Sequence, residues 1–351
     1  MATTTPRTQP SAPPSASSQI KGDMRVNNLI YKQPDSLSLA VNRTMKRQKF
    51  QQNSYSDGET AIINFNTGSD YMKNCNSYLT FELTLTGTTP TANFGIGSAV
   101  NLFESILITT RSGSELDRTE SLNLHSAKTL RQKNSQDWID NFGSMMGMGS
   151  TGIAGTDAAN TSATATKFVI PLSKLSGVFD PVGGLLLPPQ LAAGMEIRLT
   201  CADFRTALFQ KAGTVTGYTI SNISIMADLV SMSDSTQKSL NFESATNGLE
   251  YTYPRWHTAK TTGTSTDINV QISKSVAQAS MLYAVLVKQA DVLDVTTDSF
   301  ASEAWDITSW STRVGSLYQP NEPLKDTAKD ALESYFISQA VYDKARYNHA
   351  E

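Results

Sequence analysis

The residues of this chain that could do acid–base chemistry gather around one turn. Glu115, Asp117 and Glu120 lie close together in the sequence, next to Arg111 and Arg118. Paired carboxylates can act as general acid and general base when their surroundings separate their pKa values. Around a hairpin turn, however, carboxylates and arginines more often form solvated ion pairs that contribute little energy. We therefore expect no catalysis from this cluster.

The sequence also gives little support for a metal site or a nucleotide-binding site. The histidines, His125, His257 and His349, are widely separated and have no carboxylate at metal-ligand spacing. We expect Cys75 and Cys201 to be buried, reduced thiols. Residues 147–152 match the dinucleotide pattern G-x-G-x-x-G, but low-complexity sequence follows them instead of a helix, so we expect a loop. The sequence thus predicts no metal, no cofactor and no enzyme activity.

Positive charge is concentrated at the N-terminus of an otherwise acidic chain. The net charge is −3, yet residues 1–50 hold only two acidic side chains. Their basic side chains are Arg7, Lys21, Arg25, Lys32, Arg43, Lys46, Arg47 and Lys49. Such an end can face nucleic acid or lipid, contacting phosphates without reading bases. The candidate contacts are Arg43, Lys46, Arg47 and Lys49. An ordinary solvated arm explains the same composition.

The elements that carry these residues are mostly strands. Alternating or β-rich apolar runs predict strands over residues 61–66, 78–86, 102–110, 168–172, 195–199 and 218–232. Gly113 supplies a hairpin turn after residues 102–110. Residues 119–138 carry an apolar stripe at helical spacing, and residues 143–166 are typical of a surface loop. Gly-Gly and Pro-Pro pairs predict an ordered connector between the strands at 168–172 and 195–199.

The second half repeats this order of elements with almost no sequence identity, and the repeat stops partway. β-like patterns cover residues 249–256, 267–272 and 281–288, and a helical pattern covers residues 325–344. The tryptophans of this half could stack on a ligand. We favour burial in a barrel or at a subunit contact, with Trp305 and Trp310 as the contact candidates.

Spaced motifs in both halves are similar to those of one protein family. They are F-x-I-P-L at 168–172, S-G-x-F at 176–179, L-L-P-P-x-L-x-x-G-x-x-I-R-L at 186–199 and R-V-G-S-L-Y-Q-P-N-E-P-L at 313–324. With the strand–hairpin–helix stretch at 102–131, they resemble the double jelly-roll major capsid proteins. The nearest branch is that of Polintons, polinton-like viruses and virophages. The resemblance covers residues 60–345 as spaced patterns and includes no catalytic signature.

The resemblance implies an all-β fold of two jelly-roll barrels with one inserted helix per barrel. It implies a basic, partly disordered N-terminal arm at 1–57, a first jelly roll at 58–238 and a second at 239–351. Members of the family have further strands after the helix that corresponds to residues 325–344. We therefore expect the second barrel to be incomplete within this sequence.

The resemblance also implies a function. The chain would be a viral capsid protein that forms pseudo-hexagonal trimeric capsomers, which tile an icosahedral shell around double-stranded DNA. Its partners would be copies of itself, other capsid proteins such as pentons, and viral DNA or an internal membrane met by the arm. It would reach the virion from the host cytoplasm or nucleus, since the N-terminus lacks a signal peptide. The alternative is a receptor- or carbohydrate-binding jelly roll, spike-like or lectin-like, that uses residues 305–310.

Overall fold

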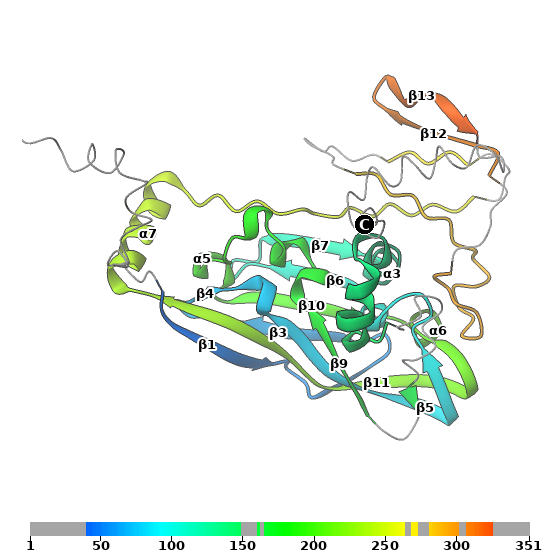
Figure 1. Cartoon of the computed structure of the whole chain (residues 1–351), viewed down its shortest axis with the longest axis horizontal. Coiled ribbons are helices and arrows are strands. Elements are labelled where there is room, and N and C mark those ends of the chain that lie inside the picture. Colours follow the sequence, from blue (N-terminus) through cyan, green and yellow to red (C-terminus); the bar gives the residue numbers. More distant parts are fainter. Residues whose placement is uncertain are drawn as a thin grey trace, which may run out of the picture. The chain divides into compact units, whose positions relative to one another are not determined.

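The computed structural model describes residues 40–148, 160–161, 165–263, 268–272, 281–301 and 307–325 (Figure 1). The strands are β1 (Ala40–Lys49), β2 (Ser54–Ser56), β3 (Thr60–Phe65), β4 (Tyr71–Met72), β5 (Tyr78–Asn93), β6 (Phe103–Thr109), β7 (Glu115–Glu120), β8 (Asn160–Thr161), β9 (Thr166–Pro171), β10 (Met195–Cys201), β11 (Phe209–Met232), β12 (Ser309–Val314) and β13 (Leu317–Lys325). The α-helices are α3 (Leu122–Lys133), α4 (Gln136–Trp138), α5 (Pro189–Ala192), α6 (Phe204–Ala207) and α7 (Asp234–Asn247). Short helical turns are η1 (Asn74–Asn76), η2 (Ala99–Leu102), η3 (Ile139–Gly143), η4 (Leu172–Lys174), η5 (Gly177–Phe179) and η6 (Val182–Gly184).

Two antiparallel sheets hold the long strands of residues 40–232. The first sheet runs β1-β11-β5-β9, with β2, β4 and β8 as short additions along the same ladders. The second sheet runs β3-β10-β6-β7. Numbered along the chain without the short additions, these strands read 1-8-3-6 in one sheet and 2-7-4-5 in the other. That order is the jelly roll, which confirms the predicted fold class. The two sheets are not joined into a closed cylinder.

The core lies between the two sheets because the apolar residues alternate along each strand. In β3 the side chains of Ala61, Ile63 and Phe65 are no more than 1% exposed, while the residues between them face outward. Phe81 on β5 meets Phe103 on β6 edge to face, with ring centroids 5.7 Å apart. These aromatic contacts join the two sheets and fill the space between them.

Tyr218 on β11 is the largest of the fully buried side chains. Its hydroxyl oxygen lies 2.6 Å from the carbonyl oxygen of Ala202 and 3.2 Å from that of Leu102. Burial is the main reason that the pKa of this phenol lies well above its ordinary value. The hydroxyl therefore acts as a fixed donor that ties β11 to the chain segments at one end of β6 and β10.

The connector between β9 and β10 is ordered, as its Gly and Pro residues predict. It contains η4, η5, η6 and α5, and Leu187 exchanges backbone hydrogen bonds with Met72 of β4. A Cβ atom at Gly177 would come within 1.8 Å of the carbonyl oxygen of Pro254, so only glycine fits there. The predicted strands of the first half are all present, Gly113 has a φ of 84° in its turn, and the predicted helix at 119–138 forms α3 and α4.

The predicted boundaries of the N-terminal arm and of the two jelly rolls stay predictions. Within the predicted arm, at residues 40–57, β1 and β2 both pair with β11. The reason is the length of β11, which at 24 residues offers a ladder on both edges. β5 and β4 lie along one edge, and the other is available to β1 and β2.

Three strand predictions in the second half are wrong for the residues that can be described. None of the described residues within 249–256, 267–272 and 281–288 belongs to a strand. Cys75 is exposed on η1 instead of buried, while Cys201 is buried as predicted. The predicted helix at 325–344, most of the loop at 143–166 and the residues Trp305 and His349 lie outside the described residues.

Removing the Tyr218 hydroxyl tests how much its hydrogen bonds contribute to the stability of the fold. We expect Tyr218→Phe to lower the free energy of unfolding by about 1–2 kcal/mol, because it leaves buried carbonyl oxygens without their donor. Tyr71→Phe, at a half-buried position, should change it by no more than about 0.5 kcal/mol. Urea unfolding of both variants measures the difference, and equal stabilities would contradict the assigned role of the hydroxyl.

Candidate functional site

The acidic cluster at the β6–β7 turn holds another part of the chain. The Glu115 carboxylate accepts a hydrogen bond from the Arg255 guanidinium at 2.8 Å. Asp117 is buried and accepts a hydrogen bond from the Ser176 hydroxyl, and burial raises the pKa of its carboxyl. Glu120 contributes its carbonyl oxygen, which accepts from the Thr258 hydroxyl. Asp117 also lies 3.7 Å from the Arg255 guanidinium, so all three residues contact residues 251–258 and the two carboxylates share one arginine.

Residues 251–258, which we call the anchor segment, lie along β7, α3 and the β9–β10 connector (Figure 1). The Tyr251 hydroxyl donates to the carbonyl oxygen of Val178, and the Tyr253 hydroxyl donates to that of Leu116, both at 2.7 Å. Thr252 accepts a backbone hydrogen bond from Val182. Alternating tyrosines that suggest a strand therefore serve as side-chain anchors, which sequence reasoning missed.

His125 on α3 lies beneath the end of the anchor segment. Its ring centroid is 4.0 Å from that of Trp256, and the Lys133 ammonium lies 5.1 Å from the same indole. Burial, with a smaller contribution from the positive charge of Lys133, lowers the pKa of His125 to about 4. His125 is therefore a neutral packing residue at pH 7, in agreement with its lack of metal-ligand spacing.

A second group of turns, at residues 291–300, is bound to the same jelly roll. The Asp298 carboxylate accepts the backbone N–H of Ile96 at 2.8 Å, and it occupies the space that a Cβ at Gly95 would need. Burial raises the pKa of the Asp298 carboxyl. Thr206 donates its hydroxyl to the carbonyl oxygen of Val292. The second half is thus fixed to the first at two separate places.

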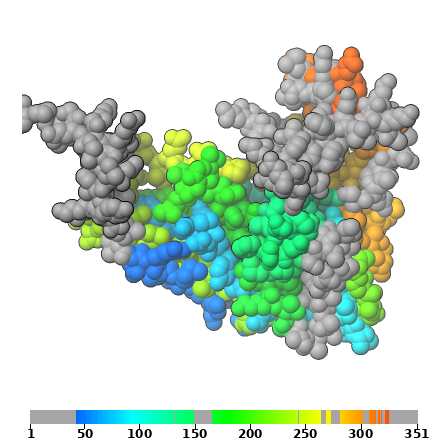
Figure 2. Space-filling model, viewed as in Figure 1, coloured from blue at the N-terminus to red at the C-terminus, as the bar shows by residue number. Residues whose placement is uncertain are grey.

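The basic residues that were candidates for phosphate contact lie on β1, and the strand register places them on two opposite faces. Arg43, Arg47 and Lys49 share one face of the strand, and Lys46 lies on the other, opposite Ala227. All four side chains are exposed, and the dark blue surface of β1 lies uncovered in Figure 2. Contact of these residues with nucleic acid or membrane stays a prediction.

Arg43 already has a protein partner. Its Nε donates to both carboxylate oxygens of Asp228, at 2.8 and 3.0 Å, and the side chain of Asp228 is fully buried. Asn76 donates a further hydrogen bond to the same carboxylate. The hydrogen bonds from Arg43 are the main reason that the pKa of Asp228 is lowered. Arg43 thus fastens β1 to β11 and offers less free charge than Arg47 or Lys49.

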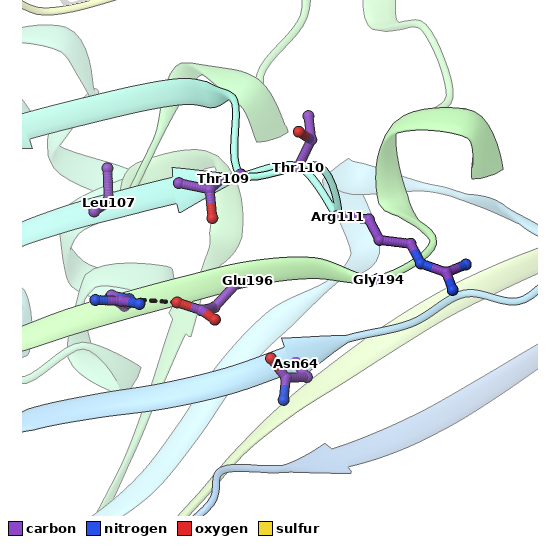
Figure 3. A pocket seen from close by; sticks show the side chains of 9 residues that line it. Asn64, Leu107, Thr109, Thr110, Arg111, Gly194 and Glu196 are labelled. Carbon is purple, nitrogen blue, oxygen red and sulfur yellow. Dashed lines mark hydrogen bonds and ion pairs between the residues drawn. The ribbon is translucent and has the colours of Figure 1, made fainter.

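A shallow hollow lies on the outer face of the second sheet (Figure 3). Its lining comes from β3, β10, β6 and the β6–β7 turn, and comprises Asn64, Leu107, Thr109, Thr110, Arg111, Gly113, Gly194, Glu196 and Arg198. Glu196 and Arg198 form an ion pair with each other. Figure 3 shows the labelled side chains spread along the sheet rather than converging on one point. The hollow has no pair of groups poised for acid–base chemistry.

Within the described ranges, no three His, Cys, Asp or Glu side chains cluster as a metal site would require. None of the helices described is long and apolar enough to cross a bilayer. Trp310 lies half-buried on β12, so its role as a subunit contact stays a prediction.

Comparison with known proteins gives matches only among solved structures. No protein-family model and no curated protein matches the chain. VP54 of PBCV-1, fitted into a reconstruction of the virophage Sputnik, shares 12% identity at a TM-score of 0.40, over 60% of this chain and 46% of that one. The Faustovirus major capsid protein shares 11% at 0.39, over 60% of this chain and 57% of that one. The STIV major capsid protein shares 9% at 0.32, over 58% and 54%.

The Faustovirus and STIV neighbours are major capsid proteins by name, and a tailspike protein of bacteriophage CBA120 also matches, at 11% identity and a TM-score of 0.17. The chain spans about half the length of VP54 and of these two capsid proteins.

The buried His125 predicts a dependence of stability on pH. Because its pKa is lower in the folded state than its ordinary value of about 6.5, stability is fully present above that value and falls as the pH drops toward about 4. His125→Phe should remove up to about 3 kcal/mol of this dependence, whereas His257→Phe, at an exposed position, should leave it intact. Urea unfolding at pH 7, 5.5 and 4 measures it; the same pH dependence in both variants would rule out the assignment.

The Arg43–Asp228 contact predicts that two substitutions on β1 differ in their effect on stability. Arg43→Ala should destabilise the fold at pH 7 more than Lys46→Ala does, because the buried carboxylate of Asp228 loses a hydrogen-bond donor. The contribution requires ionised Asp228, so it is present above the ordinary Asp pKa and is lost as the pH falls through the lowered one. Lys46→Ala is the matched control on the same strand, and an equal effect of both substitutions would argue against the contact.

Proposed function

We propose that this chain is a viral major capsid protein that works by self-assembly. The observation that carries the proposal is a jelly roll whose interior is filled. Jelly rolls serve as capsid, lectin and cupin domains, and the ligand-binding kinds need a cavity or a concave face with converging polar groups. Here Phe81 and Phe103 meet between the sheets. A barrel packed in this way acts through its outer surfaces.

Further features of the chain support the same proposal. The sequence of the second half repeats the element order of the first, as a subunit with two barrels requires. Exposed apolar side chains within residues 268–272 and 281–287, among them Ile268, Val270 and Leu282, are surface that an assembly would bury. We propose a trimeric, pseudo-hexagonal capsomer in an icosahedral shell, with copies of this chain and penton proteins as partners and the virion as its location.

The remaining parts of the proposal concern the domains and the basic end. We assign a first jelly roll to residues 40–238 and a second to 239–351, preceded by an arm at 1–39. Arg47 and Lys49 on β1 extend the positive charge of that arm and support contact with viral DNA or an internal membrane. The chain has a structural role in this proposal and performs no reaction. For the receptor- or carbohydrate-binding alternative, the hollow on the outer face of the second sheet gives little support, since its side chains labelled in Figure 3 do not converge on one point.

Size-exclusion chromatography with light scattering, followed by negative-stain imaging of each peak, tests the proposal. We expect a species of three times the chain mass of 38.1 kDa, or closed shells. Salt should have little effect on the trimer, because apolar burial drives it. A monodisperse monomer at micromolar concentration would contradict self-assembly, and binding to a glycan array would then favour the alternative.

A further inference from the structure

β1 lies at the edge of the first sheet, and one of its two sides is paired. Its ten residues run antiparallel to β11, in regular register from Asn42 to Lys49. Among the strands that the structure describes, none pairs with the other side of β1. Both faces of the strand are also open, since the side chains of residues 42–47 and of Lys49 are all exposed. An edge of this kind offers backbone N–H and C=O groups to a further strand.

The hydrogen bonds of Asp228 show which backbone groups of β1 point to the unpaired side. Asp228 is the register partner of Met45 on β11. Its backbone N–H donates to the Ser77 hydroxyl at 3.0 Å, and its C=O accepts from the Lys73 N–H at 2.8 Å, so neither group bonds β1. Opposite residues of an antiparallel pair exchange either both backbone hydrogen bonds or none. The N–H and C=O of Met45 therefore point away from β11, to the unpaired side.

The unpaired stretch of β1 is short and bounded at both ends. Backbone groups of a strand point to alternate sides, so those of Arg43 and Arg47 face the unpaired side too. At one end the Arg43 N–H donates to the Asn42 side chain at 2.8 Å. Past the other end the Gln51 N–H donates at 3.0 Å to a carbonyl oxygen of β3. The stretch between them, residues 43–49, is called the open edge below, and it fits a short extended segment.

The open edge carries positive charge on both faces. The side chains of Arg47 and Lys49 lie on one face, and that of Lys46 lies on the other. β1 contains no acidic residue, and no carboxylate of the described residues forms an ion pair with these three side chains. Arg43 differs from them, because its guanidinium is paired with Asp228. The neighbouring cations favour a negatively charged partner.

We propose that the open edge binds an extended acidic peptide of another protein, which adds to the first sheet as a further strand. Backbone hydrogen bonds to Met45 and Arg47 would hold the peptide in place. Asp or Glu side chains of the peptide would meet Lys46 on one face of the sheet and Lys49 on the other. The inference goes beyond the proposed function and does not depend on it.

The charges of β1 argue against a second copy of the strand as the occupant. Two copies of β1 paired edge to edge would bring together strands that carry only positive charge, which destabilises the pairing. Phosphates of nucleic acid or lipid suit the basic side chains, but they make no use of the outward backbone donors and acceptors of Met45 and Arg47. An acidic peptide satisfies the backbone groups and the side chains together.

Binding of a labelled peptide to the full chain, followed by fluorescence anisotropy, tests the proposal. The probe is a short peptide of alternating threonine and glutamate. We expect saturable binding of this probe and none of the matching threonine–lysine peptide. N-methylation of four backbone amides, two on each edge of the probe, keeps its charge and removes its donors. It should weaken binding at least about tenfold, because several hydrogen bonds are lost.

Substitutions in β1 separate the contribution of charge from that of the backbone. Arg47→Glu with Lys49→Glu should abolish binding of the glutamate probe and create binding of the lysine peptide. Lys238→Glu with Lys260→Glu, at exposed positions elsewhere, makes the same change in net charge and should leave probe binding unchanged. Met45→Pro removes one outward N–H and keeps the bonds to β11, so it should weaken binding at least about tenfold. Circular dichroism checks that each variant is folded.

Three results would overturn the proposal. They are no binding of the intact probe, equal binding of the N-methylated probe, and unchanged binding in the Arg47→Glu, Lys49→Glu variant. If the probe does not bind but a DNA duplex or vesicles of anionic phospholipid do, and the same charge substitutions abolish that binding, the basic residues serve phosphate contact alone. A missing trimer in light scattering would count against the proposed function and leave this inference untouched.

Discussion

The pairing of β11 with both β1 and β5 is the constraint on which the rest of the structure depends. The 24-residue strand holds the first long strand of the fold along one edge and the third along the other. Its buried Tyr218 also reaches the ends of β6 and β10 in the second sheet, through hydrogen bonds to the carbonyl oxygens of Leu102 and Ala202. Until β11 is in place, β1 has no ladder partner, so the fold is non-local and its formation is expected to be slow.

Aromatic side chains fill the space between the two sheets of the first jelly roll. The rings of Phe81, Phe103 and Phe168 pack against one another, and Asp117 and His125 are used in packing. The basic face of β1 and the exposed apolar residues described in the second half are the surface features on which the proposed self-assembly rests.

Much of the first half could be predicted because its strands bury one face. The alternation of Ala61, Ile63 and Phe65 requires burial on one side, and the structure provides it. β1 could not be predicted in this way, since its residues are basic and exposed and only the free edge of β11 makes it a strand. The alternation of Tyr251 and Tyr253 misled us, because their hydroxyls find backbone acceptors on the neighbouring jelly roll instead of a ladder.

The pairing of the first and last long strands tests the account most directly. Cysteines at Lys46 and Ala227, which are register partners on β1 and β11, should form a disulfide with Cys75 replaced by serine. Cysteines at Lys46 and Met226, one residue out of register and on the opposite face, should not. The account predicts a cross-link within one chain in the first variant only, detected by the shift in electrophoretic mobility without reductant. Cross-linking in neither variant, or equally in both, would contradict the jelly-roll order.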